Sequence, residues 1–245
     1  MRKAEPDRDD KPPLAVPVLL SFVAGYVDSY TYLALFGLFA AQVTGSFVIA
    51  GAEFVTSDYG IAGKLLAIIA FIAAAAITTA LIMLVRQAGR ATLAHMLALE
   101  AALLAIFAVM ILFGPSIKDA RDWHGIAAGL FAAGAMGAQS VLVRLLMKGM
   151  PQTNVMTGNM TQLGIALTEL LFARRRLKRS DHSAADIAEF AKVRGQLVIV
   201  LSIALGFLFG AAIGATAFAT TGLRGAPVAV AIVAGLAVWA RERAA

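Results

Sequence analysis

Two short polar motifs set in apolar stretches are the residues of this chain best suited to chemistry: Thr44 to Ser46 and Thr157 to Asn159. Glycine frees the backbone, and Thr, Ser and Asn are good N-caps, so each motif predicts a short helix that begins at Ser46 or Asn159. The backbone N–H groups and positive dipole end of such a helix suit an anion or a carboxylate. The alternative for each motif is a capped turn or a small-residue contact between helices. We predict a solute site at Thr44, Gly45, Ser46, Thr157, Gly158 and Asn159.

Three more polar residues in apolar stretches are assigned to the same site. Asp28 lies near the middle of the first stretch, where a lone carboxylate costs a few kcal/mol. It is either a proton or cation site or a structural hydrogen-bonding group. Arg144 cannot lose its proton, so it needs a partner; it could meet Asp28 at the interface between two repeats or extend to the membrane surface. Gln139 is expected to form a hydrogen bond across helices.

Other chemistry is expected to be absent. The chain has no cysteine, and its three histidines lie far apart in the sequence, so neither a disulfide nor a zinc or haem site built by the protein is expected. The common motifs of hydrolases and nucleotide-binding enzymes are missing. We therefore predict a protein that is not an enzyme and has no cofactor. Glu100 is expected near a headgroup region or paired with His95 or an arginine.

Composition identifies the elements that must position these residues. Of the 245 residues 60% are hydrophobic and 15% are charged, against about 25% charged in soluble domains. Each apolar block is long enough for a membrane-crossing helix of roughly 20 residues. The predicted fold is an all-α polytopic membrane bundle, with clear spans at 14–36, 65–85, 96–114, 125–147, 196–218 and 226–239. The polar N-terminal tail covers 1–13, and 14–245 forms one membrane domain.

The positive charge fits a membrane topology. The net charge is +6, and the cations lie between the predicted spans, most densely in the run from Arg174 to Arg179. Lysine and arginine accumulate in cytoplasmic loops. We therefore expect the lipid bilayer and a small solute as partners, without nucleic acid.

The two motifs indicate an internal duplication. Thr44 follows Gly25 almost as Thr157 follows Gly137, with one more residue in the second copy. The repeats would cover about 14–114 and about 124–241, as in many transporter folds. If the segments 37–57 and 149–172 enter the membrane and return, the chain crosses six times and the repeats are inverted. If both segments cross, there are eight spans and parallel repeats.

Charge counts do not separate these arrangements, since the first places about 17 Lys and Arg inside and about 4 outside, and the second about 16 and about 5. The loop 86–95 carries two arginines and is inside only in the first arrangement. Polar, glycine-broken backbone is also tolerated at membrane depth where protein or water surrounds it. We favour six crossings, with a re-entrant or broken helix at each motif and both termini cytoplasmic.

Two further segments predict surfaces. Ser183 to Lys192 has the pattern of a short amphipathic surface helix. Gly206, Gly210 and Gly214 form a small-residue stripe, which predicts close packing of helices within the monomer, with a homodimer as the alternative.

The ordered set of motifs resembles the YoaK family of bacterial inner-membrane proteins, which are classed as a domain of unknown function. It comprises 24–28, 43–46, 137–140 with Arg144, and 155–159, and the resemblance extends from about Leu14 to Trp239. Family members usually have Asn where this chain has Ser46, and Asn where it has Ser140. The resemblance implies a multi-pass protein of the bacterial inner membrane and brings no substrate with it.

The duplicated motif beside Asp28 and Arg144 leads to the function that we predict. The protein is expected to be a transporter or channel for a small polar or anionic solute, with its site between the two repeats. The alternative is a non-transporting assembly, sensor or partner-binding protein that uses the basic loop and the glycine stripe as contact surfaces.

Overall fold

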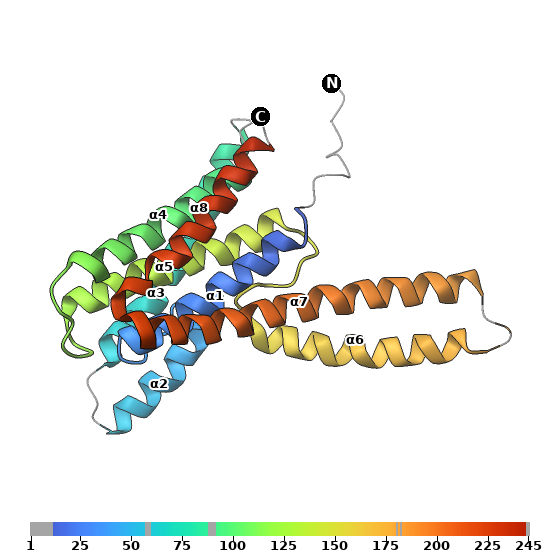
Figure 1. The fold of residues 1–245 in the computed structure, drawn as a ribbon, viewed down its shortest axis with the longest axis horizontal. Coiled ribbons are helices and arrows are strands. Elements are labelled where there is room, and N and C mark those ends of the chain that lie inside the picture. Colours follow the sequence, from blue (N-terminus) through green and yellow to red (C-terminus); the bar gives the residue numbers. More distant parts are fainter. Residues whose placement is uncertain (1–11, 57–59, 88–91, 180, 182, 244–245) are drawn as a thin grey trace.

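The computed structural model describes residues 12–56, 60–87, 92–179, 181 and 183–243, and this part of the chain consists of helices and the segments that connect them, without strands. The six predicted spans correspond to α1, α3, α4, α5, α7 and α8, and the two motif segments form α2 and α6 (Figure 1). The helices are α1 Ala15–Ala34, α2 Val43–Thr56, α3 Ile61–Gln87, α4 Thr92–Phe113, α5 Trp123–Leu146, α6 Met156–Leu177, α7 Ala184–Thr221, the short 3₁₀ helix η1 Gly222–Gly225 and α8 Pro227–Glu242.

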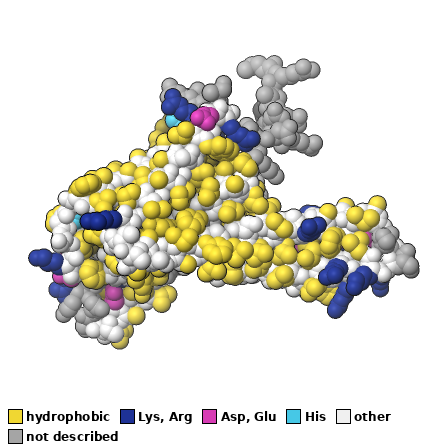
Figure 2. All heavy atoms as spheres, in the orientation of Figure 1, with side chains coloured by type: hydrophobic (Ala, Val, Ile, Leu, Met, Phe, Trp, Pro, Cys, Tyr) yellow, Lys and Arg dark blue, Asp and Glu magenta, His cyan; other side chains and the backbone are white. Residues whose placement is uncertain are grey.

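Within the described residues, 4 helical segments are long and apolar enough to cross a membrane: Ile61–Arg86, Thr92–Phe113, Trp123–Leu146 and Ala184–Gly225. Large apolar side chains are exposed on their outer faces, for example Ile72, Phe113 and Phe209. Figure 2 shows apolar side chains over the flanks of the bundle and cations gathered near the ends of its helices. A surface with this distribution suits a lipid environment.

The helices pair across the two halves of the chain. Helix α1 packs along α7, and α3 packs along α5, while α4 lies against both α5 and α8. The two motif helices pack within their own halves, α2 against α3 and α6 against α7. In Figure 1, α6 and the first part of α7 form a hairpin that extends to the right, away from the other helices.

Glycines bring the paired helices into backbone contact. A methyl group at Gly210 would overlap the carbonyl oxygen of Phe22, and one at Gly214 would overlap that of Tyr26. The same holds at Gly25 against the carbonyl of Phe207. The predicted packing of the glycine stripe within the monomer is therefore confirmed, and α1 occupies the surface that a dimer would have used.

One predicted element is wrong. The segment from Ser183 to Lys192 does not form a separate surface helix, because it continues without a break into α7. The helix begins at a capping box in which the Ser183 hydroxyl accepts the N–H of Asp186, and the Asp186 carboxylate accepts the N–H of Ser183. A single glycine, Gly195, lies between the amphipathic segment and the apolar one. An isolated glycine costs a helix only about 1 kcal/mol, so the helix propagates through both segments.

Candidate functional site

The helices at the two motifs begin earlier than predicted. Helix α2 starts at Val43 and α6 at Met156, so Thr44 and Thr157 lie in the first turn rather than in front of it. Ser46 and Asn159 are consequently inside the helices and do not act as N-caps. The two helices begin near each other in the middle of the molecule and run to different ends of it (Figure 1).

The N-termini of α2 and α6 line one cavity of about 210 Å³. Thr44 reaches it from α2 and Thr157 from α6, and both threonines are exposed. Ser140 and Asn154 supply further polar groups, whereas the remaining wall is largely apolar. The lining residues are Ala41, Gln42, Val43, Thr44, Phe71, Ser140, Asn154, Val155, Met156 and Thr157.

Ser46 and Asn159 hold the segments that precede their helices. The Ser46 hydroxyl donates to the carbonyl of Phe39 at 3.4 Å, and the Asn159 amide donates to the carbonyl of Gln152 at 2.7 Å. Both acceptors lie 7 residues earlier in the chain. Both donors are buried, so each motif fastens its own approach segment to the first turn of its helix.

Asp28 is buried and bound to backbone. Its Oδ1 accepts the N–H of Ala41 at 2.6 Å, and Oδ1 and Oδ2 accept the N–H of Gln42 at 3.2 and 3.1 Å. The carboxylate therefore lies directly in front of the N-terminus of α2, where a negative charge is favourable. Asp28 supports the cavity from behind and is not among its lining residues.

Gln139 connects three parts of the structure. Its amide nitrogen donates to the carbonyl of Leu20 in α1 and to the hydroxyl of Thr153, each at 2.8 Å. Ser21 completes this cluster by donating to the carbonyls of Thr153 and Ile203. Gln139 is fully buried, so its visible role is to fix the segment before α6 against α1.

One of the two alternatives for Arg144 is excluded, and the prediction for Glu100 is wrong. Arg144 does not meet Asp28: Arg144 is exposed near the end of α5, whereas Asp28 is buried against the start of α2. Glu100 is neither interfacial nor paired. It is fully buried in α4, and both carboxylate oxygens lack a hydrogen-bond partner among the described residues. Helix α4 packs against α5 and α8. The position of Glu100 in the sequence does not show that its side chain is enclosed by these helices.

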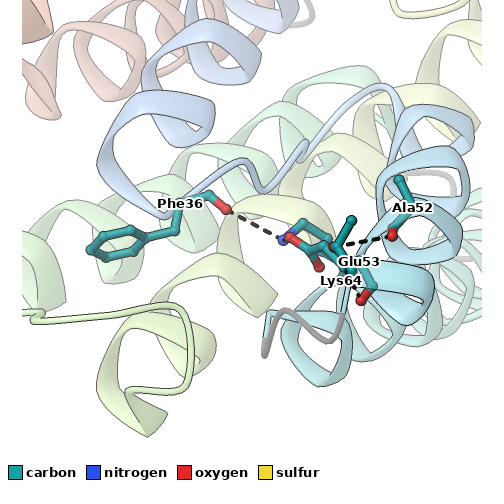
Figure 3. Close-up of polar contacts among 5 residues, drawn as sticks. Phe36, Ala52, Glu53 and Lys64 are labelled. Atoms are coloured by element: carbon teal, nitrogen blue, oxygen red, sulfur yellow. Dashed lines mark hydrogen bonds and ion pairs between the residues drawn. The ribbon is translucent and has the colours of Figure 1, made fainter.

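An ion pair that sequence reasoning missed joins three elements near the start of α3. Lys64 Nζ lies 2.6 Å from Glu53 Oε1 in α2 and donates to the carbonyl of Phe36 at 3.3 Å (Figure 3). The Lys64 and Glu53 side chains are only 2% and 14% exposed, and Glu53 Oε2 has no partner among the described residues. The sequence offered one indication of this ion pair: Lys64 is a single lysine directly before the apolar stretch 65–85.

A second and larger cavity lies on the other side of the first turn of α6. Its volume is about 420 Å³, and it is open to the outside between α6, α7 and the segment before α6. Gly149, Gly158, Asn159, Gln162 and Gln196 give it a polar wall. Within the described residues, no group of His, Cys, Asp or Glu is arranged to hold a metal ion.

Of the nine residues predicted for the solute site, the structure places Thr44 and Thr157 on the 210 Å³ cavity and six others around it. Gly158 and Asn159 line the larger cavity. Gly45, Ser46, Asp28 and Gln139 form the supporting structure, and Arg144 lies apart.

Comparison with known proteins gives a single result. No curated protein matches the sequence, and no solved structure matches the fold. The sequence profile described as Protein of unknown function (DUF1275) matches residues 16–239, which includes both motifs and all the helices that surround the cavities. The chain therefore belongs to the DUF1275 family.

Proposed function

We propose that this protein is a transporter or channel for a small anionic or polar solute, and that the solute binds in the 210 Å³ cavity between the starts of α2 and α6. It is a multi-pass protein of the bacterial inner membrane with six crossings and cytoplasmic termini. The observation that carries the proposal is that Thr44 and Thr157, from the two copies of one motif, line the same cavity.

Paired contacts support two repeats, α1–α4 and α5–α8. Helix α1 packs on α7 as α5 packs on α3, and α2 packs on α3 as α6 packs on α7. Gly25 meets the carbonyl of Phe207 on α7, and Gly137 meets the carbonyl of Phe71 on α3. The first helix of each half thus packs on the third helix of the other half. Two repeats related by a twofold axis have this contact pattern.

The same correspondence extends to the segments before the short helices. Gly37 and Gly149 both have left-handed backbone, at φ 82° and φ 86°. Ser46 and Asn159 then make hydrogen bonds with the same spacing of 7 residues. Two segments with the same turn and the same side-chain tether are expected from a duplicated unit.

The length of α2, and the place where both motif helices begin, favour the re-entrant arrangement. Helix α2 has 14 residues, a length of about 21 Å that cannot cross a hydrocarbon core about 30 Å thick. Helix α6 is longer, with 22 residues, and like α2 it begins in the middle of the molecule (Figure 1). The backbone in front of each helix is irregular, which a membrane tolerates where protein or water surrounds it. This arrangement places both helix N-termini at membrane depth, as in transporters with broken helices.

The two N-termini differ in charge, and the difference favours an anionic solute. Asp28 places a carboxylate at the start of α2. The matching position before α6 is Ser140, which donates to the Asn154 side chain at 3.4 Å and adds no charge. None of the described residues that line the cavity is acidic, so among them the positive end of α6 has no resident anion beside Thr157. A small anion in the cavity would complement it.

Anion-driven swelling of proteoliposomes tests this function. Vesicles in isosmotic salts of nitrate, formate and acetate, with a cation ionophore present, are compared with vesicles in urea or glycerol. Thr157→Val should lower anion flux about tenfold, the value of one hydrogen bond to a charged group. Thr168→Val is the matched control, because Thr168 is an exposed threonine farther along α6 that bonds its own helix. Equal flux in both variants and the parent chain would reject the assigned site.

The projecting end of the α6–α7 hairpin supports a second candidate function, a membrane protein that binds a partner without transport. This end carries Arg174, Arg175, Arg176 and Lys178. A stoichiometric partner that copurifies with the parent chain, and is lost when these four residues are replaced by glutamine, would favour it. This second function also requires that none of the tested anions causes the proteoliposomes to swell.

A further inference from the structure

The two halves of the chain differ at one matched place, between the segment that precedes each motif helix and the long helix that follows it. In the second half this place is the 420 Å³ cavity, lined by Met150, Gln196 and Val200 among others. In the first half it is a space of about 10 Å³, lined by Leu38, Gly60 and Lys64 among others. The repeat correspondence of the proposed function pairs these residues in order, Leu38 with Met150, Gly60 with Gln196 and Lys64 with Val200.

We propose that the 420 Å³ cavity is the site through which the solute enters from one side of the membrane, and that the Lys64–Glu53 ion pair closes the matching entry on the other side. The inference rests on the proposed function, since it assigns the route to the central cavity. The two cavities adjoin across one turn of α6: Thr157 lines the central cavity, and Gly158 lines the larger one.

Two features make the first space smaller. Residues within 117–126, from the connection between α4 and α5 and the start of α5, also line it and have no counterpart at the 420 Å³ cavity. The side chains at the matched places differ as well. Glu53 and Lys64 correspond to Ala166 and Val200 of the second half, which are both buried and too short to bridge a gap. Lys64 instead links α3 to α2 through Glu53, and to the end of α1 through the carbonyl of Phe36. The ammonium group of Lys64 therefore holds together α3, α2 and the segment after α1. These three elements would have to separate to open the first entry.

The ion pair is also suited to opening. Glu53 Oε2 has no hydrogen-bond partner among the described residues, so burial leaves part of the carboxylate uncompensated. Water that enters an open route would solvate this oxygen and the ammonium group. The closed form therefore has a compact ion pair, and the open form gains hydration, which keeps the two forms close in free energy.

The solute that fits this route is small and polar or anionic. The wall of the 420 Å³ cavity offers the amides of Asn159, Gln162 and Gln196 and the backbone at Gly149 and Gly158. Amide N–H groups donate to anions and to neutral oxygens alike, so the entry accepts both. Selection between them then falls to the helix N-terminus at Thr157.

Cysteine accessibility tests the inference without any transport measurement, because the chain has no cysteine of its own. Leu38→Cys and Met150→Cys occupy matched positions and are labelled in lipid nanodiscs, where both faces are open to a small water-soluble maleimide. Met150→Cys should react about tenfold faster or more, because Leu38 becomes accessible only when the closed route opens.

The double substitution Glu53→Ala with Lys64→Val gives the first half the residues of the second. It should raise the labelling rate of Leu38→Cys at least about tenfold, since the route no longer needs to break an ion pair to open. Glu53→Gln removes the charge with little change of shape and should act in the same direction if the double variant does not fold.

Equal rates at Leu38→Cys and Met150→Cys in the parent chain would overturn the inference, as would an unchanged Leu38→Cys rate in folded variants. Failure of the proposed function looks different. In that case the labelling asymmetry would be present while no anion drives swelling.

Discussion

The Asp28 side chain binds the backbone of Ala41, which lies 13 positions farther along the chain: Asp28 Oδ1 accepts the N–H of Ala41 at 2.6 Å. The same carboxylate accepts the N–H of Gln42, the last residue before α2. In the second half Ser140 bonds the side chain of Asn154, which lies just before α6. In both halves a polar side chain of a long helix fixes the start of the following short helix, and thereby one wall of the cavity.

The first prediction concerns this contact. Asp28→Ala leaves two N–H groups without an acceptor in a buried place and should lower the free energy of unfolding by about 2 kcal/mol or more. Asp28→Asn keeps one acceptor oxygen and should lose less. The melting temperature in detergent, followed by size-exclusion chromatography, measures the effect. Asp181→Ala, at an exposed aspartate, is the control. Equal melting of Asp28→Ala and Asp181→Ala would show that the contact contributes nothing.

The second prediction concerns helix contacts through glycine. Gly210→Ala would overlap the carbonyl of Phe22, and Gly137→Ala that of Phe71. Each should destabilise the protein by about 1–3 kcal/mol, because backbone must move to admit the methyl group. Gly235→Ala in α8 meets nothing within 4 Å and should be neutral or slightly stabilising. A parent-like melting temperature for Gly210→Ala would contradict the close packing of α1 on α7.

A third prediction addresses Glu100. Its two oxygens are buried without partners among the described residues, so Glu100→Leu should raise the free energy of unfolding by about 1–3 kcal/mol. Glu189→Leu provides the comparison. Glu189 forms an ion pair with Arg176 that is 45% exposed on both sides, and its loss should change stability by less than about 1 kcal/mol. A drop in stability for Glu100→Leu would mean that the carboxyl group has a stabilising partner.

The fourth prediction concerns topology. Six crossings place Ser116, between α4 and α5, outside the cell, whereas eight crossings place it inside. Lys178, after α6, is inside in both. Ser116→Cys in intact cells should react with an impermeant thiol reagent, and Lys178→Cys should react only after the membrane is opened. Protection of Ser116→Cys until lysis would support eight crossings.

Much of the architecture follows from the sequence, because a membrane helix needs a long apolar run and nothing else. The six long blocks became α1, α3, α4, α5, α7 and α8 with ends shifted by a few residues. The larger error, at the start of α7, arose because the amphipathic and apolar segments are both good helices, and the one glycine between them, Gly195, does not end the helix. The glycine stripe was also predictable, since its spacing places three glycines on one helix face.

The site was harder to predict, because residue type does not say which polar group faces a cavity. Thr44 and Thr157 were identified by their repetition, and both line the central cavity. Asp28 was marked by its charge, but its partners are backbone N–H groups, which no sequence pattern displays. The Lys64–Glu53 pair was missed because it depends on how α2 folds back against α3.

The central claim is that the start of α6 faces a water-filled cavity that favours negative charge. Thr157→Cys in the cysteine-free chain can be labelled with two thiosulfonates of similar size, one anionic and one cationic. The ratio of the two rates does not depend on the acidity of the thiol, which affects both reactions alike. Thr168→Cys, at an exposed position of the same helix, is the reference.

The anionic-to-cationic rate ratio should be about tenfold higher at Thr157→Cys than at Thr168→Cys, because the proposed site at the N-terminus of α6 would concentrate anions. Thr44→Cys should give a smaller ratio, since the Asp28 carboxylate lies at the start of α2. Equal ratios at Thr157→Cys and Thr168→Cys, or no reaction at Thr157→Cys in folded protein, would contradict the claim.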